Sequence, residues 1–416
     1  MDMRSLQTVD HALFDCLCRE AERQKYGLEM IASESMQPRL ALELAGGVFN
    51  NKTAVGNPGN QRLQGSRHAD QLERLAAERA CAIFGADHAN MTTYSGTVAN
   101  FCAYAAVLKP GDRVLAMDPV TGAHQSHGGG KNISSKLYEF HFFGLDPKTF
   151  EIDYADAERK ARSLSPKLIV VGSAAYPRRI DYARLAEIAH QNGALLMADI
   201  AHFTGLVAAG LSPNPVPHAD IVTASTTKTM CGPHSGFVMC RRELAAAVES
   251  SIYPGYVASL HLQTIAAMTY ALGRSQTAEF RALMERVLSN AGALCKALRE
   301  RGFGLFTGGT DCHMLLLELH AFGIDGVRFS ALLEEIGITV NSKGIPFDLS
   351  PVAMGVRMGT TVLSQRGMGA GEMEEIAQIL YLAATHPDDG AVLSDLKARV
   401  RDLAERFPIP EAYREA

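Results

Sequence analysis

The residue with the clearest chemical potential in this sequence is Lys228, which lies within the run Thr-Ala-Ser-Thr-Thr-Lys-Thr-Met-Cys-Gly-Pro-His-Ser-Gly at residues 223–236. A lysine amine in a confined site can form a Schiff base with an aldehyde cofactor, and pyridoxal phosphate also needs an acid that keeps its pyridine nitrogen protonated. Asp199 fits this second role, because it ends an apolar run in which a carboxylate is costly without a cationic partner. Each residue alone also has an ordinary interpretation, as a solvated lysine or a strand-end aspartate.

A second candidate is the turn Ser95-Gly96-Thr97, which opens a helix of small residues expected to end at Leu108. Backbone N–H groups, two hydroxyls and the positive end of a helix dipole make such a turn a seat for a phosphate group. The structural alternative is a simple helix N-cap. The loop at residues 50–61 is crowded with Gly, Pro and Asn, and either lines a site or only connects.

Composition bounds the class of protein. The chain has 416 residues, 47% of them hydrophobic and 20% charged, as expected for a soluble α/β enzyme large enough for two domains. A net charge of -5 argues against nucleic acid or an anionic membrane as a partner and favours small molecules. The eight cysteines have no zinc-type spacing, so reduced cysteines and no metal site are expected. The polar start and the lack of a long apolar run favour a cytoplasmic location.

The apolar patterns predict an α/β fold. Strand-like runs at residues 113–117, 167–171, 194–198 and 221–223 alternate with helical stretches such as residues 182–191. This order indicates a mostly parallel sheet covered by helices on both faces, which binds ligands beyond the carboxyl ends of its strands. Asp199 and the residues after Thr223 would lie at that edge.

Three segments are expected along the chain. Residues 1–27 form a helical arm, residues 28–273 a large cofactor-binding domain, and residues 274–416 a smaller α+β domain that begins with a long charged helix.

Ten motifs then point to one family. They are Ile31-Ala-Ser-Glu-Ser, Asn51-Lys-Thr, Gly56-Asn-Pro-Gly, Ser95-Gly-Thr-Val-Ala-Asn, His124 before Ser126-His-Gly, Asp199-Ile-Ala-His, Gly205-Leu-Val-Ala-Ala-Gly, Thr227-Lys-Thr, Gly308-Gly-Thr-Asp and Gly355-Val-Arg-Met-Gly-Thr. With them the chain resembles the serine hydroxymethyltransferase family of fold type I pyridoxal-phosphate enzymes over nearly its whole length. The resemblance implies a mostly parallel, seven-stranded type of sheet wrapped by helices, with a smaller C-terminal α+β domain.

The resemblance also implies roles for residues around the cofactor. Lys228 would carry it, Asp199 would meet the pyridine nitrogen, His124 would stack on the ring, and His202 would lie near its phenolic oxygen. The phosphate would be cradled by Ser95, Gly96 and Thr97. Thr227, next to the lysine, joins the candidate catalytic residues. The alternative to a cofactor role for the two histidines is that they are ordinary, partly buried side chains whose ring nitrogens are hydrogen-bonded.

For the amino acid substrate, the resemblance implies that Arg357 forks onto the carboxylate, a bidentate geometry that lysine cannot copy. Ser33 would assist it, and Thr53 would line the substrate site. The implied reaction breaks or makes the Cα–Cβ bond of a β-hydroxy-α-amino acid, with tetrahydrofolate accepting the one-carbon unit.

The sequence departs from the family pattern at several positions. A Glu of the family loop is Val55 here, and its Tyr is Thr53. Loss of that Glu removes a general acid/base, so folate use is in doubt. Further departures are Arg62, Leu63, Ala174, Thr227, His234, Tyr253–Ser259 and Phe347. Thr53, Thr227 and Tyr176-Pro-Arg resemble the α-methylserine hydroxymethyltransferase branch, in which alanine replaces glycine.

The resulting hypothesis is a hydroxymethyltransferase or aldolase that acts on serine or α-methylserine and yields glycine or alanine plus a one-carbon unit. Alternatives are a folate-independent aldolase or transaldolase that uses another aldehyde, a transaminase or racemase, and a silent cofactor-binding homologue. Because family sites are shared between subunits, a homodimer or homotetramer is expected, with Arg62 and residues 258–259 reaching a neighbour's site.

Overall fold

The computed structural model describes residues 3–413, which pack as two compact units. One unit combines the residues up to Arg39 with those from Arg286 onward, and the other is Leu40–Glu285.

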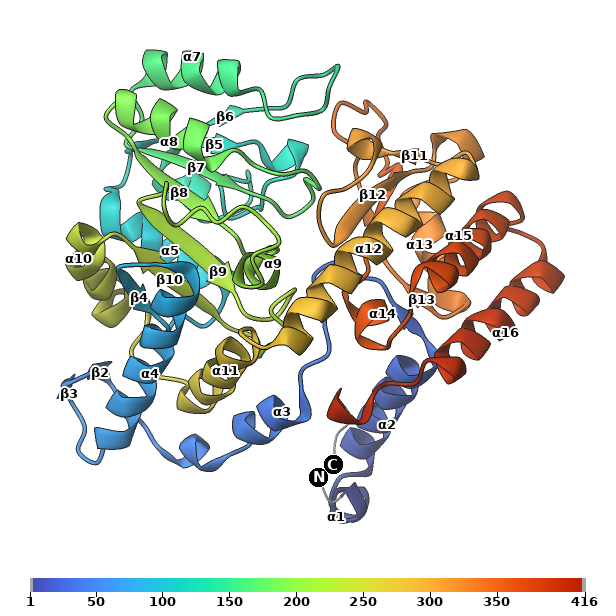
Figure 1. Ribbon diagram of the computed structural model, residues 1–416, viewed down its shortest axis with the longest axis horizontal. Helices are drawn as coiled ribbons and strands as arrows, with labels where there is room; N and C mark the ends of the chain where they lie inside the picture. Colours follow the sequence, from blue (N-terminus) through green and yellow to red (C-terminus); the bar gives the residue numbers. More distant parts are fainter. Residues whose placement is uncertain (1–2, 414–416) are drawn as a thin grey trace. The chain divides into compact units, whose positions relative to one another are not determined.

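The unit at residues 40–285 is built on one twisted sheet (Figure 1). Within the described chain this sheet has seven strands in the order β4-β10-β9-β8-β7-β5-β6. The strands are β4 (His88–Asn90), β5 (Arg113–Met117), β6 (Glu139–Phe143), β7 (Leu168–Gly172), β8 (Leu195–Asp199), β9 (Ile221–Ser225) and β10 (Gly236–Cys240). Neighbours from β6 to β9 pair in parallel, whereas β10 is antiparallel to both β9 and β4. The predicted mostly parallel sheet is thereby confirmed.

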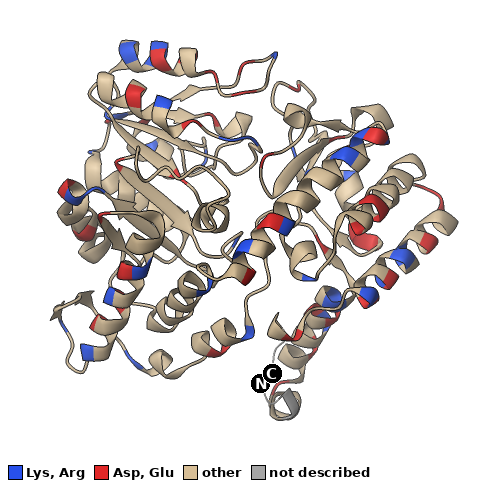
Figure 2. Cartoon of the chain, in the orientation of Figure 1, with Lys and Arg blue, Asp and Glu red and all other residues tan. Residues whose placement is uncertain are grey.

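Helices pack against this sheet and bury its strands. Strands β7 and β9 are buried at every position, the pattern of strands covered on both faces. Figure 2 draws strands β8 and β9 mostly in tan, while charged residues gather on helices such as α4 and α7. The helices are α3 (Arg39–Ala45), α4 (Arg67–Phe84), α5 (Gly96–Val107), α6 (Ser134–Leu137), α7 (Tyr154–Leu164), α8 (Tyr182–Gln191), α9 (Thr204–Ala208), α10 (Ala245–Ser250) and α11 (Leu262–Arg274). A hairpin of β2 (Gly56–Asn57) and β3 (Asn60–Gln61) lies in the polar loop.

The other unit contains an antiparallel sheet in the order β11-β12-β15-β14. Its strands are β11 (Gly304–Leu305), β12 (Met314–Glu318), β14 (Asn341–Lys343) and β15 (Gly355–Gly359), and β1 (Leu28–Glu29) pairs in parallel with β13 (Ile338–Thr339). Its helices are α1 (Met3–Val9), α2 (His11–Tyr26), α13 (Gly326–Glu335), α14 (Thr361–Gln365), α15 (Ala370–Thr385) and α16 (Gly390–Arg406). Helix α12 (Ala278–Glu300) runs across the boundary at residue 285. Leu28, Leu317, Phe329 and Leu380 are among the side chains of the buried apolar core.

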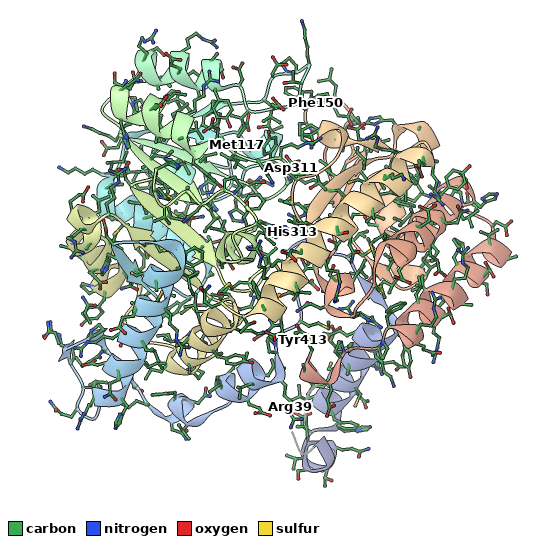
Figure 3. The ribbon with its side chains drawn as sticks, viewed as in Figure 1. Arg39, Met117, Phe150, Asp311, His313 and Tyr413 are labelled. Carbon is green, nitrogen blue, oxygen red and sulfur yellow. The ribbon has the colours of Figure 1, made fainter. Side chains whose placement is uncertain are left out.

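This division differs from the predicted segments 1–27, 28–273 and 274–416 in three places, and the first is that residues 1–27 belong to the unit that contains the C-terminal residues. Residues 28–39 belong with the C-terminal residues, because Leu28 pairs with Ile338 and the Met30 N–H donates to the Thr339 carbonyl at 2.9 Å. His313, labelled in Figure 3, also lies 3.0 Å from the Ala32 carbonyl oxygen through its Nε2. The first turns of α12 belong to the other unit.

Most predicted elements form close to their expected limits. Strand β5 and helix α8 match them residue for residue, because clear signals bound the helix: Asp181 accepts a hydrogen bond from the Arg184 N–H, and Asn192 follows the last turn. Strand β9 extends to Ser225, two residues beyond the prediction, because it pairs with β10 along its whole length. Within residues 3–413, no helix is long and apolar enough to cross a membrane.

Candidate active site

A cavity of about 190 Å³ opens at the carboxyl ends of β7, β8 and β9, beside the first turn of α5. Parallel sheets bind ligands beyond the carboxyl ends of their strands, so the cavity lies where the sequence predicted the site. The cavity is lined by Ser95, Gly96, Thr97, Asn100, His124, Ser173, Ala174, Asp199, Ala201, His202, Ser225, Thr227, Lys228, His234 and Ser235.

The N-terminus of α5 forms one wall. Ser95 is the N-cap, and its hydroxyl oxygen accepts a hydrogen bond from the Val98 N–H at 3.2 Å. The first turn of a helix leaves N–H groups without intrahelical partners, and its dipole favours an anion. Gly236 on β10 permits this arrangement, because a Cβ there would lie 2.4 Å from the Ser95 carbonyl carbon and 2.6 Å from the Gly96 nitrogen. The wall therefore combines the Ser95 and Thr97 hydroxyls with a half-buried helix N-terminus.

Asp199 ends β8 and is only 6% exposed. Its Oδ2 accepts a hydrogen bond from the Asn100 amide at 2.9 Å and lies 3.1 Å from His127 Nε2, and its Oδ1 accepts from the Ala201 N–H at 2.8 Å. Burial alone would raise the pKa of this carboxyl, but hydrogen bonds from His127 and Asn100 hold the pKa well below its usual range. Asp199 is thus a buried anion, and an ionised carboxylate has about four acceptor positions. The three donors leave about one position for a group in the cavity.

Behind Asp199 lies a polar network that sequence reasoning missed. Asn100 also accepts a hydrogen bond from the Thr223 hydroxyl at 2.6 Å and donates to the Ser126 hydroxyl at 2.9 Å. Ser126 Oγ in turn lies 2.7 Å from His124 Nδ1. A signal was available, because Gly96, Asn100 and Tyr104 recur every four residues and so share one face of α5.

Lys228 follows β9 in a turn that closes on itself. The Gly232 N–H donates to the Thr226 carbonyl at 2.7 Å, and the Cys231 N–H donates to the Lys228 carbonyl at 3.1 Å. The Thr229 hydroxyl donates to the His202 carbonyl at 2.9 Å, which ties the lysine turn to the segment after β8. These bonds bring Lys228 and His202 to the same cavity as Asp199.

The cavity residues fit pyridoxal phosphate. The start of α5 offers hydroxyls and a dipole to a phosphate, Asp199 offers an anionic acceptor to a protonated pyridine nitrogen, and Lys228 offers an amine to an aldehyde. The backbone approach that Gly236 permits is a second feature of such a cradle. Within the described chain, no three His, Cys, Asp or Glu side chains are grouped to hold a metal ion.

The cavity thus gathers the eight residues predicted for the cofactor and its chemistry: Ser95, Gly96, Thr97, His124, Asp199, His202, Thr227 and Lys228. It does not include Thr53, which is exposed in the loop before β2. Val55 forms an isolated bridge with Ser259, and the Leu260 N–H donates to the Ala54 carbonyl at 3.1 Å. The loop therefore packs against residues 258–260 of its own chain.

Ser33 and Arg357 belong to the other unit. Arg357 lies on β15 opposite Asn341 of β14, and its Nε donates to the Asn341 Oδ1 at 3.0 Å. Burial lowers the pKa of the Arg357 guanidinium, and burial and then Arg357 lower the pKa of the Lys343 amine. Together these features describe a half-buried cationic pair with a preference for an anion.

The fold and the cavity define a fold type I pyridoxal-phosphate enzyme. A comparison with family models gives a match to serine hydroxymethyltransferase over residues 6–380. The chain therefore belongs to the serine hydroxymethyltransferase family, and it is a pyridoxal-phosphate-dependent transferase with aldol-type chemistry at a carbon–carbon bond. Proteins of this family act on small amino acids and are oligomeric.

Proposed function

We propose that this enzyme makes and breaks the Cα–Cβ bond of β-hydroxy-α-amino acids, with serine and α-methylserine as substrates and glycine and alanine as products, without requiring tetrahydrofolate. The observation that carries the proposal is the shared cavity of Lys228, Asp199 and the α5 terminus. When bound, pyridoxal phosphate withdraws the electrons released as a bond at the substrate α-carbon breaks.

The residues of the chain divide this work. Ser95, Gly96 and Thr97 hold the phosphate, Asp199 keeps the pyridine nitrogen protonated, and Lys228 supplies the amine that holds the aldehyde carbon. His124 and His202 orient the ring and its phenolic oxygen. Arg357, assisted by Ser33, binds the substrate carboxylate.

We propose that the enzyme prefers α-methylserine to serine, because small side chains line the cavity. Ala174 and Thr227 line the cavity, and Thr227 directly precedes Lys228; the family pattern has Ser and His at these two positions. A shorter side chain next to the reacting amine leaves room for one more methyl group, which in an apolar contact changes binding by about 1–3 kcal/mol.

Independence from folate follows from Val55. An apolar side chain cannot move a proton, so the acid/base function of the family Glu is absent at this position. Among the described residues that line the cavity, Asp199 is the one carboxylate, and its three donors hold it as an anion.

The test is formaldehyde release from L-serine and from both enantiomers of α-methylserine, each with and without tetrahydrofolate, with Lys228→Ala as the inactive control. Faster release from α-methylserine that does not depend on folate supports the proposal. Strict dependence on folate contradicts the reading of Val55, and no release from any substrate contradicts the reaction itself.

We also propose that the oligomer is a homodimer or homotetramer in which Arg62 and residues 258–259 reach a neighbouring site. Sedimentation velocity gives the assembly. Mixing Arg62→Ala chains with Lys228→Ala chains tests the sharing, because recovery of activity in the mixture requires sites built from two chains.

A further inference from the structure

A buried chain of hydrogen bonds leads from Asp199 into the core. His127 Nε2 lies 3.1 Å from Asp199 Oδ2, and His127 Nδ1 lies 2.5 Å from the Tyr104 hydroxyl oxygen. Tyr104 is 0% and His127 is 1% exposed. Tyr104 comes from α5 and His127 from the loop after β5, whose last residue, Met117, is labelled in Figure 3.

The donors and acceptors of this chain fix the positions of the protons. Asp199 is ionised and can only accept, so His127 Nε2 must carry a proton and donate it. Burial, and then the negative charge of Asp199, raises the pKa of the Tyr104 hydroxyl well above its usual range. Tyr104 therefore keeps its proton. In the tautomer with its only proton on Nε2, the His127 imidazole has a lone pair on Nδ1, and the Tyr104 hydroxyl can donate to it.

The Asn100 branch supports the same assignment. Its amide nitrogen must face Asp199, because a carboxylate cannot donate, and its carbonyl oxygen then accepts from the Thr223 hydroxyl. The same nitrogen donates to the Ser126 hydroxyl, which leaves the Ser126 proton for His124 Nδ1. The directions of the Asn100 hydrogen bonds thus follow from an anionic Asp199.

We propose that Tyr104 is a positioning residue for this enzyme: its hydroxyl holds His127 in the tautomer with the proton on Nε2, and His127 in turn holds Asp199 as an oriented anion at the cavity wall. Tyr104 does not line the cavity itself and acts on it through two other residues, His127 and Asp199. The proposal rests on the cofactor role assigned to Asp199, but the tautomer itself can be measured without cofactor.

Loss of the Tyr104 hydroxyl has a defined consequence. His127 Nδ1 would lose its donor, and a buried polar nitrogen without a partner is costly. A shift of the imidazole proton to Nδ1 would turn the Nε2 lone pair toward the carboxylate, so the Asp199 anion would lose a donor. The alternative is that Tyr104 only satisfies two buried polar groups and has no effect on the cavity.

The first measurement is the ¹⁵N NMR spectrum of histidine side chains in the full-length chain without cofactor, with His127 assigned by the loss of its signal in His127→Asn. We expect a neutral ring with its proton on Nε2 and a hydrogen-bonded Nδ1 across the neutral pH range. A proton on Nδ1, or a doubly protonated ring at neutral pH, would overturn the proposal without any reference to cofactor or activity.

The second measurement compares Tyr104→Phe with Tyr138→Phe. Tyr138 is also buried, and its ring packs against that of Tyr104 with centroids 5.8 Å apart, so it controls for the loss of a buried phenol. We expect Tyr104→Phe to change the His127 tautomer signal and to weaken pyridoxal phosphate binding about tenfold, as for one lost buried hydrogen bond. We expect Tyr138→Phe to leave both unchanged. Equal losses in the two variants, or no loss in Tyr104→Phe, would show that packing alone matters.

Discussion

Replacement of Asp199 by Asn is the sharpest test of the site, because it removes the charge and keeps the shape. Asparagine retains one acceptor oxygen, so it can serve either the two donors at Oδ2, Asn100 and His127, or the Ala201 N–H at Oδ1. At least one buried donor is left unpaired, and the remaining bonds lose their charge assistance. We expect the free energy of unfolding to fall by about 2–4 kcal/mol.

Asp220 provides a matched control in the same sheet. It is also buried, precedes β9 at the opposite edge, and accepts from the Leu196 N–H at 2.7 Å. His190 Nε2 lies 2.9 Å from its Oδ2 and Arg241 Nε lies 3.1 Å from its Oδ1. Asp220→Asn therefore has a similar cost for folding, but no group at the cavity changes.

The assay measures urea unfolding of cofactor-free chains and pyridoxal phosphate binding by absorbance titration. Asp199→Asn should weaken binding by about 10–100-fold, because the pyridine nitrogen loses a charge-assisted partner, while Asp220→Asn should bind normally. Equal loss of binding in both variants, or unchanged binding in Asp199→Asn, would refute the role of Asp199. An unchanged stability of Asp199→Asn would mean that desolvation of the carboxylate offsets its three hydrogen bonds.

The pH dependence gives a further check on the same variant. The pKa of Asp199 is lower in the folded chain than in the unfolded chain, where it is about 4. Its contribution to stability is therefore complete above that value and is lost as the pH falls below it. The difference in unfolding free energy between the native chain and Asp199→Asn should narrow as the pH falls below about 4. A difference that stays the same size below about pH 4 would contradict the lowered pKa of Asp199.

Three further predictions concern other parts of the chain. In Gly236→Ala the new Cβ would lie 2.4 Å from the Ser95 backbone and should displace it. The change should lower the free energy of unfolding by about 1–3 kcal/mol and should also weaken cofactor binding. Normal cofactor affinity by titration would contradict a phosphate site at the start of α5. Glu73 is 5% exposed, and burial, followed by nearby carboxylates, raises its pKa from 4.5 to about 8. The folded chain therefore loses stability as the pH rises between these values. Glu73→Gln should be more stable than the native chain by about 2–4 kcal/mol at about pH 8 but about equal to it near about pH 4. Equal urea unfolding curves for the two chains at both pH values would exclude a raised pKa for Glu73. Arg357→Lys should raise KM for the amino acid by about 10²-fold with a smaller change in kcat. Asn341→Ala, which removes the acceptor for the Arg357 Nε and a donor to the Ser342 carbonyl, should raise KM less. An unchanged KM in Arg357→Lys would remove Arg357 from the substrate site.

Local signals were enough to predict the elements that carry the site. Ser95 is an N-cap residue, and its hydroxyl together with the small residues that follow it predicts where the helix begins. The strand that ends at Asp199 is an apolar run with a carboxylate at its end, and alternation of such runs with helices predicts a parallel sheet whose carboxyl edge collects the ligand-binding residues. The position of the cavity followed from these short-range patterns.

Only the tertiary structure decided what surrounds Asp199 and where the chain divides. Asn100 and His127 approach the carboxylate from 99 and 72 residues away in sequence, and Tyr104 approaches His127 from another element. Such contacts depend on strand order and helix rotation, which no local pattern specifies. The pairing of Leu28 with Ile338 likewise joins residues 28–39 to the C-terminal unit, because a strand pair needs only matched edges and not nearness in sequence. The sequence thus determined which residues could do chemistry, and the packing of distant segments determined the charge and hydrogen bonds with which Asp199 would do it.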